Sequence, residues 1–447
     1  MRRRDILAGI GAAAVGVAAA PILGSPARRQ PNIVVVLADD LGYGDLGSYG
    51  ARLIKTPHLD RFAAQGMRLT DFYASANVCT PSRAGLLTGR YPIRTGLGHG
   101  VILANDKRGL PQSEITIAEA LKPTYKTALI GKWHLGHTPE YWPPTKQGFD
   151  VFFGLPYSHD IKPLALYSAS PGVELTSENV NFQKLTERFI DRGLRFIEDS
   201  RNEPFFLLLA LTAPHIPLHP NPPFTHSHAG SYGDVVEEVD AGVGRLMATL
   251  GRLGLDRETF VVVTSDNGPW FEGSTGALRA RKGDPGWDGG YRVPFMARMP
   301  GVIPARQTSD AIGMNIDLMP TILALAGVSP PVGLTIDGVN LTGVLAGRSR
   351  QSPHEELVLF MDERVAGIRT PRWKLVGRSY YRGYDIPLTK LGAWLLFDLA
   401  IDPAESYNVA ERHPEIVADM KRRFARAIER YEPLGVTKQA EKLPVID

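Results

Sequence analysis

Four short apolar segments of this chain end abruptly in polar or charged residues. They cover residues 33–37, 127–130, 205–211 and 260–264, and each is a nearly continuous apolar run without polar alternation. Runs of this kind are typical of strands buried on both faces, as in a parallel sheet. We therefore predict that these four segments are strands of one sheet.

Segments with apolar residues at three- and four-residue spacing lie between these strands. The clearest cover residues 58–66, 116–122, 181–200 and 232–254. Strands that alternate with helices predict an α/β fold, with a large, mostly parallel or mixed sheet flanked by helices. Because ligands bind beyond the carboxyl ends of strands in such sheets, we expect the polar residues there to form a site.

The pattern changes after about residue 347. Residues 356–376 and 392–410 are typical of short antiparallel strands joined by turns, and residues 414–431 of an amphipathic helix. We predict a catalytic domain over residues 31–347. A smaller subdomain, an antiparallel sheet with one packing helix, is predicted over residues 348–447.

The first 27 residues have the layout of an export signal. Three arginines at positions 2–4 precede an apolar run rich in Ala and Gly, which closes on small residues near Ala20 or Ala27. Paired arginines indicate the twin-arginine route, and hence a periplasmic or secreted bacterial protein. The alternative is a membrane anchor over residues 6–23. It is disfavoured because Ala and Gly add little apolar area and Pro21 interrupts the run.

The net charge argues against nucleic acid or an anionic membrane as a partner, and the cysteine content excludes an intramolecular disulfide. A formal charge of +3 over 447 residues gives no reason to expect nucleic acid or an anionic membrane surface as a partner. The single cysteine, Cys79, cannot form an intramolecular disulfide. The oligomeric state is not indicated by any pattern in the chain.

Two of the predicted strands end in oxygen-bearing side chains. Asp39 and Asp40 follow the first, and Asp266 and Asn267 follow the last. Either pair alone would most often be part of a turn, but both at strand ends favour a metal site. Carboxylate and amide oxygens suit hard cations such as Ca²⁺ and Mg²⁺, whereas zinc would favour His or Cys.

Cationic and imidazole side chains accompany this predicted metal site. They are Arg83, Lys132, His134, His215 and Lys282. Such groups neutralise the oxygen charge that shifts during sulfate or phosphate transfer. A helix predicted to begin near Ser82 would direct backbone N–H groups towards an anion beside residue 79.

Several motifs resemble those of the sulfatase family. "CTPSRAGLLTGR" resembles its first signature and "GKWHLG" its second. "ADDLGYGD", "APHIPLH", "SDNGP" and "LFDLAIDPAESYN" resemble its other blocks in the same order, over about residues 31–409. "GLPYSHD" and "HGVILANDKRGLP" are similar to the arylsulfatase A branch. The resemblance implies an alkaline-phosphatase-like fold.

The resemblance also implies a modification of the lone cysteine. In sulfatases a formylglycine-generating enzyme oxidises this residue to formylglycine, an aldehyde that exists as its hydrate. One hydroxyl of the hydrate attacks sulfur, and the other later expels sulfate as the aldehyde re-forms. Cys79 would thus be a precursor rather than a thiol nucleophile; the alternative is a buried structural cysteine.

The metal-binding roles follow residue by residue from the resemblance. Asp39, Asp40, Asp266 and Asn267 would bind Ca²⁺, with Mg²⁺ as the alternative, together with a formylglycine oxygen at position 79. Asp266 would also accept the proton of the attacking hydroxyl.

The remaining roles concern the hydrate and the sulfate group. Arg83 and Lys132 would hold the hydrate, and His134 would act as base when the covalent ester collapses. His215 and Lys282 would bind the sulfate oxygens and assist the leaving alcohol or phenol. Ser158, in "YSHD", would be a further sulfate-binding residue.

The chain departs from the family pattern in two places. "KGDPGWDGGYRVP" has one extra residue after Lys282 and Asp288 where the family usually has Glu. The active-site histidine of the arylsulfatase A branch has no counterpart, because no His lies between positions 354 and 413. Tyr380, Tyr381 and Arg382 are the candidates for substrate contacts there.

We therefore predict an arylsulfatase that hydrolyses sulfate monoesters of small molecules, glycans or lipids. The first alternative is a phosphate or phosphonate ester hydrolase of the same superfamily, since it would use the same fold and metal chemistry. The second is an inactive protein that binds sulfated glycans. It is disfavoured because every residue to which the resemblance assigns a catalytic role above is present.

Overall fold

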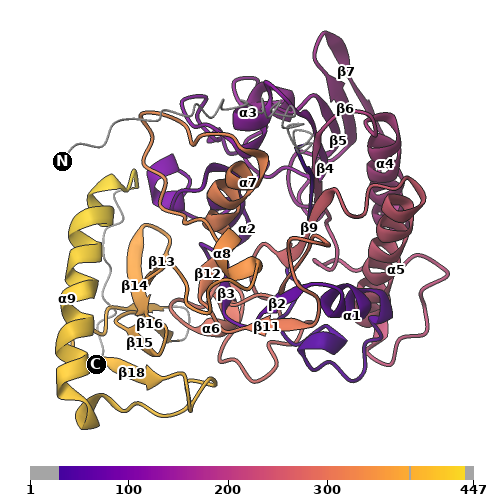
Figure 1. Ribbon diagram of the computed structural model, residues 1–447. Helices are drawn as coiled ribbons and strands as arrows, with labels where there is room; N and C mark the ends of the chain where they lie inside the picture. Colours follow the sequence, from indigo (N-terminus) through magenta and orange to yellow (C-terminus); the bar gives the residue numbers. More distant parts are fainter. Residues whose placement is uncertain (1–29, 382–383, 438–447) are drawn as a thin grey trace, which may run out of the picture.

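The computed structural model describes residues 30–381 and 384–437. A ten-stranded mixed sheet forms its centre, with helices on both faces (Figure 1). In spatial order the strands are β11 (Gln307–Ser309), β2 (Met67–Leu69), β10 (Phe295–Arg298), β9 (Thr259–Ser265), β1 (Asn32–Ala38), β8 (Phe205–Ala210), β4 (Lys126–Lys132), β5 (Val151–Leu155), β6 (Leu166–Ser170) and β7 (Val173–Glu178).

The four strands predicted from apolar runs form the middle of this sheet. β9, β1, β8 and β4 are neighbours in that order, and every pair is parallel. Val35 of β1 lies between Leu208 and Val262, and all seven residues of β1 are buried. Full burial of such side chains stabilises the fold by about 1.5–3 kcal/mol each. The predicted strands are confirmed, and their carboxyl ends meet at one edge.

The outer strands make the sheet mixed. β10 is antiparallel to both β9 and β2. On the other side β5 is parallel to β4, and β6 and β7 continue as an antiparallel pair. Every residue of β7 is exposed, so this edge strand buries no face of its own.

Alternate residues of β1 face two separate cores. Val35 and Leu37 belong to the core that packs against α2 (Cys79–Thr88), α3 (Ile117–Leu121) and α7 (Leu318–Ala326). Val34 and Val36 belong to the core beneath α1 (Pro57–Ala64), α4 (Leu185–Asp199) and α5 (Gly230–Arg252). Helices therefore cover both faces, and the carboxyl edge of the central strands remains for a site. The predicted helices correspond to α1, α3, α4 and α5.

The C-terminal part has the predicted antiparallel sheet and helix. The strand order is β13 (Leu357–Met361), β14 (Arg364–Arg369), β15 (Trp373–Val376) and β18 (Leu395–Asp398). α9 (Pro414–Tyr431) has the predicted bounds and packs Met420 and Phe424 into the core of this sheet. Figure 1 shows α9 in yellow along the outside of the molecule.

The two parts also contain short elements. They are β3 (Phe72–Tyr73), α6 (Asp288–Tyr291), β12 (Gly313–Met314), the 3₁₀ turn η5 (Asn315–Asp317), α8 (Thr342–Leu345), β16 (Ser379–Tyr381) and β17 (Tyr384–Ile386). The predicted domain boundary near residue 347 falls between α8 and β13.

In residues 30–381 and 384–437, no helix combines the length and apolar character needed to span a membrane. The predicted export signal, residues 1–27, lies outside the described residues.

Candidate active site

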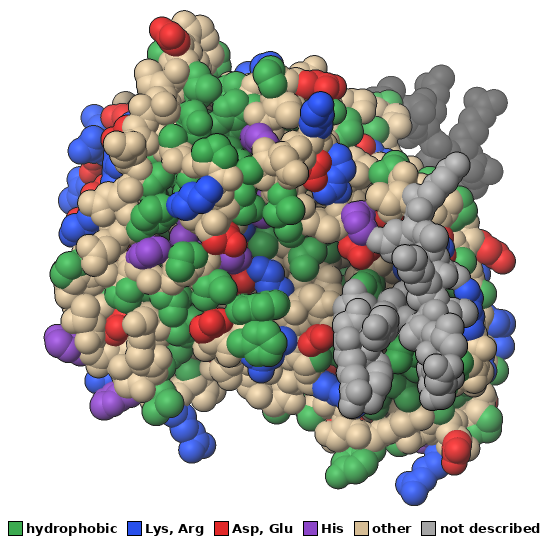
Figure 2. Space-filling view, turned by 180° about the vertical axis from the view of Figure 1, so that it is seen from behind, with side chains coloured by type: hydrophobic (Ala, Val, Ile, Leu, Met, Phe, Trp, Pro, Cys, Tyr) green, Lys and Arg blue, Asp and Glu red, His purple; other side chains and the backbone are tan. Residues whose placement is uncertain are grey.

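The predicted site residues come together at the carboxyl edge of the central strands. Asp39 and Asp40 follow β1, Lys132 ends β4, and Asp266 and Asn267 follow β9. His134 lies two residues beyond β4, and His215 lies in the segment after β8. Figure 2 shows acidic, basic and histidine side chains gathered near the middle of one face.

Two of these residues adopt a left-handed backbone conformation. Asp40 has φ of 64° and His134 has φ of 63°. This conformation costs a non-glycine residue about 1–3 kcal/mol and persists only where the surroundings enforce it. At Asp40 the backbone N–H donates to Asp266 Oδ1 at 3.1 Å, which joins the turns after β1 and β9.

Asp39 is neutralised by buried cations. Lys132 Nζ lies 2.9 and 2.7 Å from its two carboxylate oxygens, and Arg83 Nη2 lies 3.5 Å from Oδ1. Although burial alone would raise the pKa of Asp39, the positive charge of Lys132, followed by those of His215 and Arg83, holds that pKa well below its usual value. Asp39 is therefore ionised over the whole physiological range.

Arg83 also binds the second carboxylate of the site. Its Nε and Nη2 lie 2.9 and 2.8 Å from Asp266 Oδ2, and its Nη1 donates to the Lys132 carbonyl at 3.0 Å. Burial raises the pKa of Asp266 to about 6, against the opposing charge of Arg83. The two buried aspartates thus differ in proton affinity, which suits a fixed anion and a proton acceptor.

Cys79 lies at the start of α2 and faces both metal-site aspartates. Its Sγ is 3.5 Å from Asp39 Oδ1 and 4.0 Å from Asp40 Oδ1. Burial raises the pKa of its thiol to about 12, so the unmodified side chain is a protonated, poor nucleophile. The helix predicted near Ser82 begins at Cys79 instead, because Pro81 falls in the first turn, where its missing N–H costs no hydrogen bond.

A buried asparagine that the motifs did not reveal fixes this helix. Asn315 Nδ2 donates to the carbonyl and hydroxyl oxygens of Ser82 at 3.0 and 2.8 Å. Ser82 Oγ in turn donates to the Asp266 carbonyl, so Asn315 ties α2 to the turn after β9. Nothing in the sequence around Asn315 distinguishes it from an asparagine that caps the end of a helix.

Asp40 is held by three side chains from other segments. Asn267 Nδ2 donates to its Oδ1 at 2.7 Å, and Lys282 Nζ lies 2.6 Å from its Oδ2. His215 Nε2 is 3.6 Å from the same Oδ2. Lys282, the lysine whose alignment with the family motif is irregular, therefore reaches the site.

His134 is poised to accept a proton. Its Nε2 lies 3.0 Å from the Ile102 carbonyl, which can only accept, so Nε2 carries the hydrogen and Nδ1 is left as an acceptor. Nδ1 is buried without a partner among the described residues. Burial, together with the charges of Lys132 and Arg83, holds the pKa of His134 well below its usual value, so the ring is neutral at pH 7.

Other buried polar atoms at the site also lack protein partners in the described residues. Ser158 Oγ and Asn267 Oδ1 are the two that matter here. Buried polar atoms are normally satisfied, so unpartnered ones at a candidate site are places for a ligand.

Two carboxylates, a thiol and an imidazole form a group that could hold a cation. Candidate ligand atoms of Asp39, Asp40, Cys79 and His215 all lie within 4.8 Å of one another. This group contains His215 in place of the predicted Asp266, whose Oδ2 is engaged by Arg83. The unpartnered oxygen of Asn267 and the carboxylates supply the oxygen ligands that Ca²⁺ or Mg²⁺ prefers.

Three histidines that lie beside one another flank the site. The rings of His159 and His215 have centroids 5.7 Å apart, and those of His159 and His219 are 6.0 Å apart. Burial lowers the pKa of His159 to about 4, so this ring is neutral at pH 7. Sequence reasoning identified only His215, because the neighbouring histidines have no distinctive spacing.

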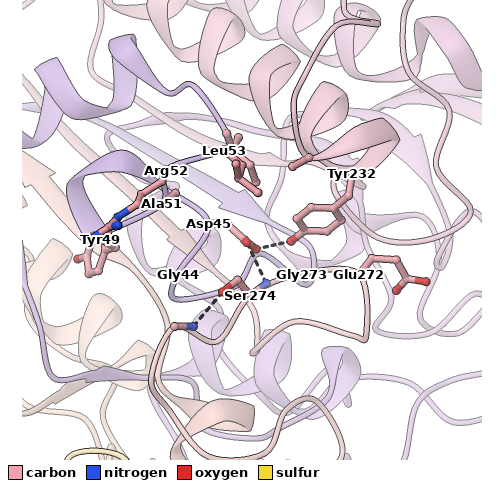
Figure 3. A pocket seen from close by; sticks show the side chains of 14 residues that line it. Gly44, Asp45, Tyr49, Ala51, Arg52, Leu53, Tyr232, Glu272, Gly273 and Ser274 are labelled. Carbon is pink, nitrogen blue, oxygen red and sulfur yellow. Dashed lines mark hydrogen bonds between the residues drawn. The ribbon is translucent and has the colours of Figure 1, made fainter.

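A cavity of about 340 Å³ is lined in part by the segment after Asp40, including Gly44 and Asp45. Figure 3 shows Asp45 there, between Tyr232 and Ser274. Asp45 accepts hydrogen bonds from Tyr232 Oη at 2.5 Å, Ser274 N at 2.9 Å and Gly42 N at 2.8 Å. Through these three hydrogen bonds, the carboxylate stabilises the turn that follows Asp39 and Asp40.

Comparison with known proteins decides the family. The sulfatase family model matches residues 31–328. Bovine arylsulfatase A is 38% identical over 443 residues, which cover 89% of this chain and 86% of that protein. The chain belongs to the sulfatase family. Within that family it lies near the arylsulfatase A branch.

Three further comparisons show what else this sulfatase resembles. A model described as the C-terminal part of N-sulphoglucosamine sulphohydrolase matches residues 286–430. Steryl-sulfatase of Mus musculus is 34% identical over 474 residues, covering 85% of this chain and 76% of that one. A solved structure from work on glycosaminoglycan metabolism by Bacteroides thetaiotaomicron has a TM-score of 0.81 at 27% identity. It covers 90% of this chain and 100% of its own. The alkaline-phosphatase-like fold is confirmed.

Of the two departures from the family pattern in this sulfatase, the structure describes the side chain at the first but not the side chains at the second. Asp288 points away from the site, into a buried cluster with Lys374 of β15. The side chains of Tyr380, Tyr381 and Arg382 lie outside the described part, so their proposed contacts with substrate stay predictions.

Proposed function

We propose that this sulfatase hydrolyses sulfate monoesters as an arylsulfatase. The observation that carries the proposal is the interleaving of carboxylates and cations around Cys79. Within the site, the charges of Asp39, Asp40 and Asp266 balance those of Arg83, Lys132 and Lys282. A bound divalent cation makes the site positive and therefore attractive to an anionic ester.

Asp39, Asp40, Asp266 and Asn267 would hold the cation, which we propose to be Ca²⁺. When bound, it supplies a Lewis acid that offsets charge on the ester oxygens. Asp39 retains its negative charge through its pairing with Lys132 and Arg83. It can therefore anchor a cation without competing for a proton.

Position 79 would carry formylglycine, made from Cys79 during maturation. A hydrated aldehyde supplies a hydroxyl that attacks sulfur and a second hydroxyl that permits sulfate release. Sγ, 3.5 Å from Asp39, marks the place from which those oxygens act. The unmodified thiol is a poor nucleophile, because burial raises its pKa to about 12.

Two residues of the chain would move protons. Asp266, with its pKa raised to about 6, accepts the proton of the attacking hydroxyl. The neutral ring of His134 takes a proton at Nδ1 when the covalent ester collapses. Lys282 and His215 both lie beside Asp40 Oδ2, from where they would bind sulfate oxygens and stabilise the departing alkoxide or phenoxide.

We propose that the leaving group has a ring that packs on an exposed aromatic pair. Trp270 and Phe271 are 38% and 68% exposed and follow Asn267 by three and four residues. Arg281, next to Lys282, donates to the Trp270 carbonyl at 3.2 Å and lies 5.0 Å from the centre of the Phe271 ring. The pair is thereby tied to the segment that carries Lys282.

Changing Trp270 to Ala is expected to raise KM for 4-nitrophenyl sulfate about 3- to 10-fold with little change in kcat. Loss of an aromatic contact costs about 0.5–1.5 kcal/mol, and this contact is the same in the ground and transition states. Steady-state kinetics of Trp270→Ala measure it. Tyr407→Ala, a change to an exposed aromatic residue of the C-terminal part, is the matched control. An unchanged KM in Trp270→Ala would contradict the proposed contact.

The proposed function is tested by comparing kcat/KM for 4-nitrophenyl sulfate with that for a phenyl phosphonate monoester. Sulfate and phosphonate groups are both tetrahedral anions, so the cations around Asp40 decide between them. We expect the sulfate ester to be the better substrate. A higher value for the phosphonate would replace the proposal with a phosphonate hydrolase, and turnover of neither would favour a binding protein.

A further inference from the structure

The segment that carries Lys282 is attached to the site along its backbone. Lys282 N donates to the Pro269 carbonyl at 3.0 Å, and Gly283 N donates to the Asn77 carbonyl at 3.1 Å. The Lys282 ammonium is 2.6 Å from Asp40 Oδ2. Small displacements of this segment would therefore move the ammonium relative to the sulfate position.

The far end of the same segment is held by the C-terminal sheet. Asp288, the first residue of α6, accepts from Lys374 Nζ of β15 at 2.7 Å. Its backbone N–H donates to Glu405 Oε2 at 2.8 Å, and Glu405 Oε1 is 2.6 Å from Lys374 Nζ. Three residues from two parts of the chain thus form one closed set of contacts.

These three groups are fully buried. Asp288, Lys374 and Glu405 are each 0% exposed. The cluster contains two carboxyl groups but only one lysine. The positive charge of Arg292, 3.4 Å from Asp288, balances the additional carboxyl group. Buried ions stay in place only while every partner is present, and apolar residues of similar size would stabilise the interface as well or better. Stability alone is therefore a weak reason for charges at this place.

The backbone between the cluster and the site has little freedom to rearrange. Gly289 lies so close to the Ala280 carbonyl that an added Cβ would be 2.1 Å from that oxygen. Gly289 N also donates to the Arg279 carbonyl at 2.8 Å, and Arg279 Nη1 donates to the Glu405 carbonyl at 2.8 Å. A shift of Asp288 is thus transmitted to the residues next to Lys282.

We propose that Lys374 and Glu405 are positioning residues: by holding Asp288, they fix the position of the Lys282 ammonium at the site. The inference rests on the proposed function, because Lys282 matters as a group that stabilises the leaving oxygen. It assigns to the C-terminal part of the chain a role in the chemical step. Neither residue touches substrate, so their effect must pass through Lys282.

The test is a double-mutant comparison of Lys374→Met in the wild-type and Lys282→Ala backgrounds. The substrates are phenyl sulfates whose phenols span a range of pKa values. We expect Lys374→Met to lower kcat/KM about 10- to 100-fold for the poorest leaving groups, as is typical for residues that orient a catalytic group. The dependence of kcat/KM on the pKa of the leaving phenol should become steeper, as we also expect for Lys282→Ala. In the Lys282→Ala background the same change should cost nothing further.

A purely structural role gives a different result. If Lys374→Met lowers kcat/KM by the same factor in both backgrounds, with no change in the dependence on phenol pKa, the proposal is overturned. If Lys374→Met does not fold, Glu405→Gln is compared in the same two backgrounds. That variant keeps an oxygen acceptor for Asp288 N and removes the ionisable carboxyl group. The same pattern, with a smaller loss, supports the proposal, and equal losses in both backgrounds overturn it.

Arg372→Gln is the matched control. Arg372 pairs with Asp398 at 2.7 Å on the same sheet, but its side chain is 60% exposed. We expect its kinetics to equal those of the wild type. Absence of sulfate ester turnover in the wild type itself would refute the proposed function, whereas the ratios among active variants test only the positioning role.

Discussion

Replacing Cys79 with serine is expected to lower steady-state turnover of sulfate esters by about 10⁴-fold or more, the scale seen when a nucleophile is removed. Serine has one hydroxyl on Cβ, so a sulfate ester formed there has no neighbouring hydroxyl to expel it. The thiol of Cys79 makes only long contacts, 3.5 and 4.0 Å, with Asp39 and Asp40. The fold should therefore persist, with a melting temperature close to that of the wild type.

The measurement is release of 4-nitrophenol by Cys79→Ser over many enzyme equivalents. Cys79→Ala serves as the control, because it lacks any hydroxyl and should release none. Activity reduced only severalfold in Cys79→Ser would show that the nucleophile does not come from position 79.

Changing Asp39 to Asn is expected to abolish activity and also to destabilise the protein by about 3–5 kcal/mol, since it leaves buried cations without their partner. Lys132 is 1% exposed and contacts both oxygens of Asp39, and Arg83 is 3% exposed. The removed charge was ionised at every pH near neutrality, because its pKa lies well below the usual value. The full effect should thus be present at pH 7.

Denaturant unfolding in the presence of a chelator measures this effect without any contribution from bound metal. Asp191→Asn is the matched control, because Asp191 pairs with Arg245 at 2.5 Å on the surface, with both side chains more than 40% exposed. Surface pairs of this kind contribute at most about 1 kcal/mol. Equal losses in the two variants would mean that the charges around Asp39 do not support the fold.

The centre of the fold was predictable because its strands are buried on both faces. β1 contains the apolar run 33–38 and β9 the apolar run 260–263, and that pattern has few alternatives. α9 was predicted with its bounds because Pro414 marks its first turn and a regular apolar spacing continues to Tyr431. The edge strand β7 was not predicted, because its fully exposed residues carry no burial pattern.

The site was predictable where its residues follow central strands. Asp39, Lys132 and Asp266 each lie at a strand end, and neighbouring parallel strands bring such ends together. Asn315 and Glu405 could not be predicted in this way. Their partners, Ser82 and Lys374, are distant in sequence, and nothing in the local sequence of either residue marks the contact. The start of α2 was also predicted too late, near Ser82, whereas the helix begins at Cys79.

The most direct test of the account is the mass of the tryptic peptide over residues 69–83, which contains Cys79 as its only cysteine. The protein should be purified from its native source, so that its own maturation enzyme has acted. We predict the mass of the formylglycine form, which reacts with a hydrazide as an aldehyde and resists thiol alkylation. A fully alkylated thiol at Cys79 in protein that hydrolyses sulfate esters would contradict the formylglycine mechanism.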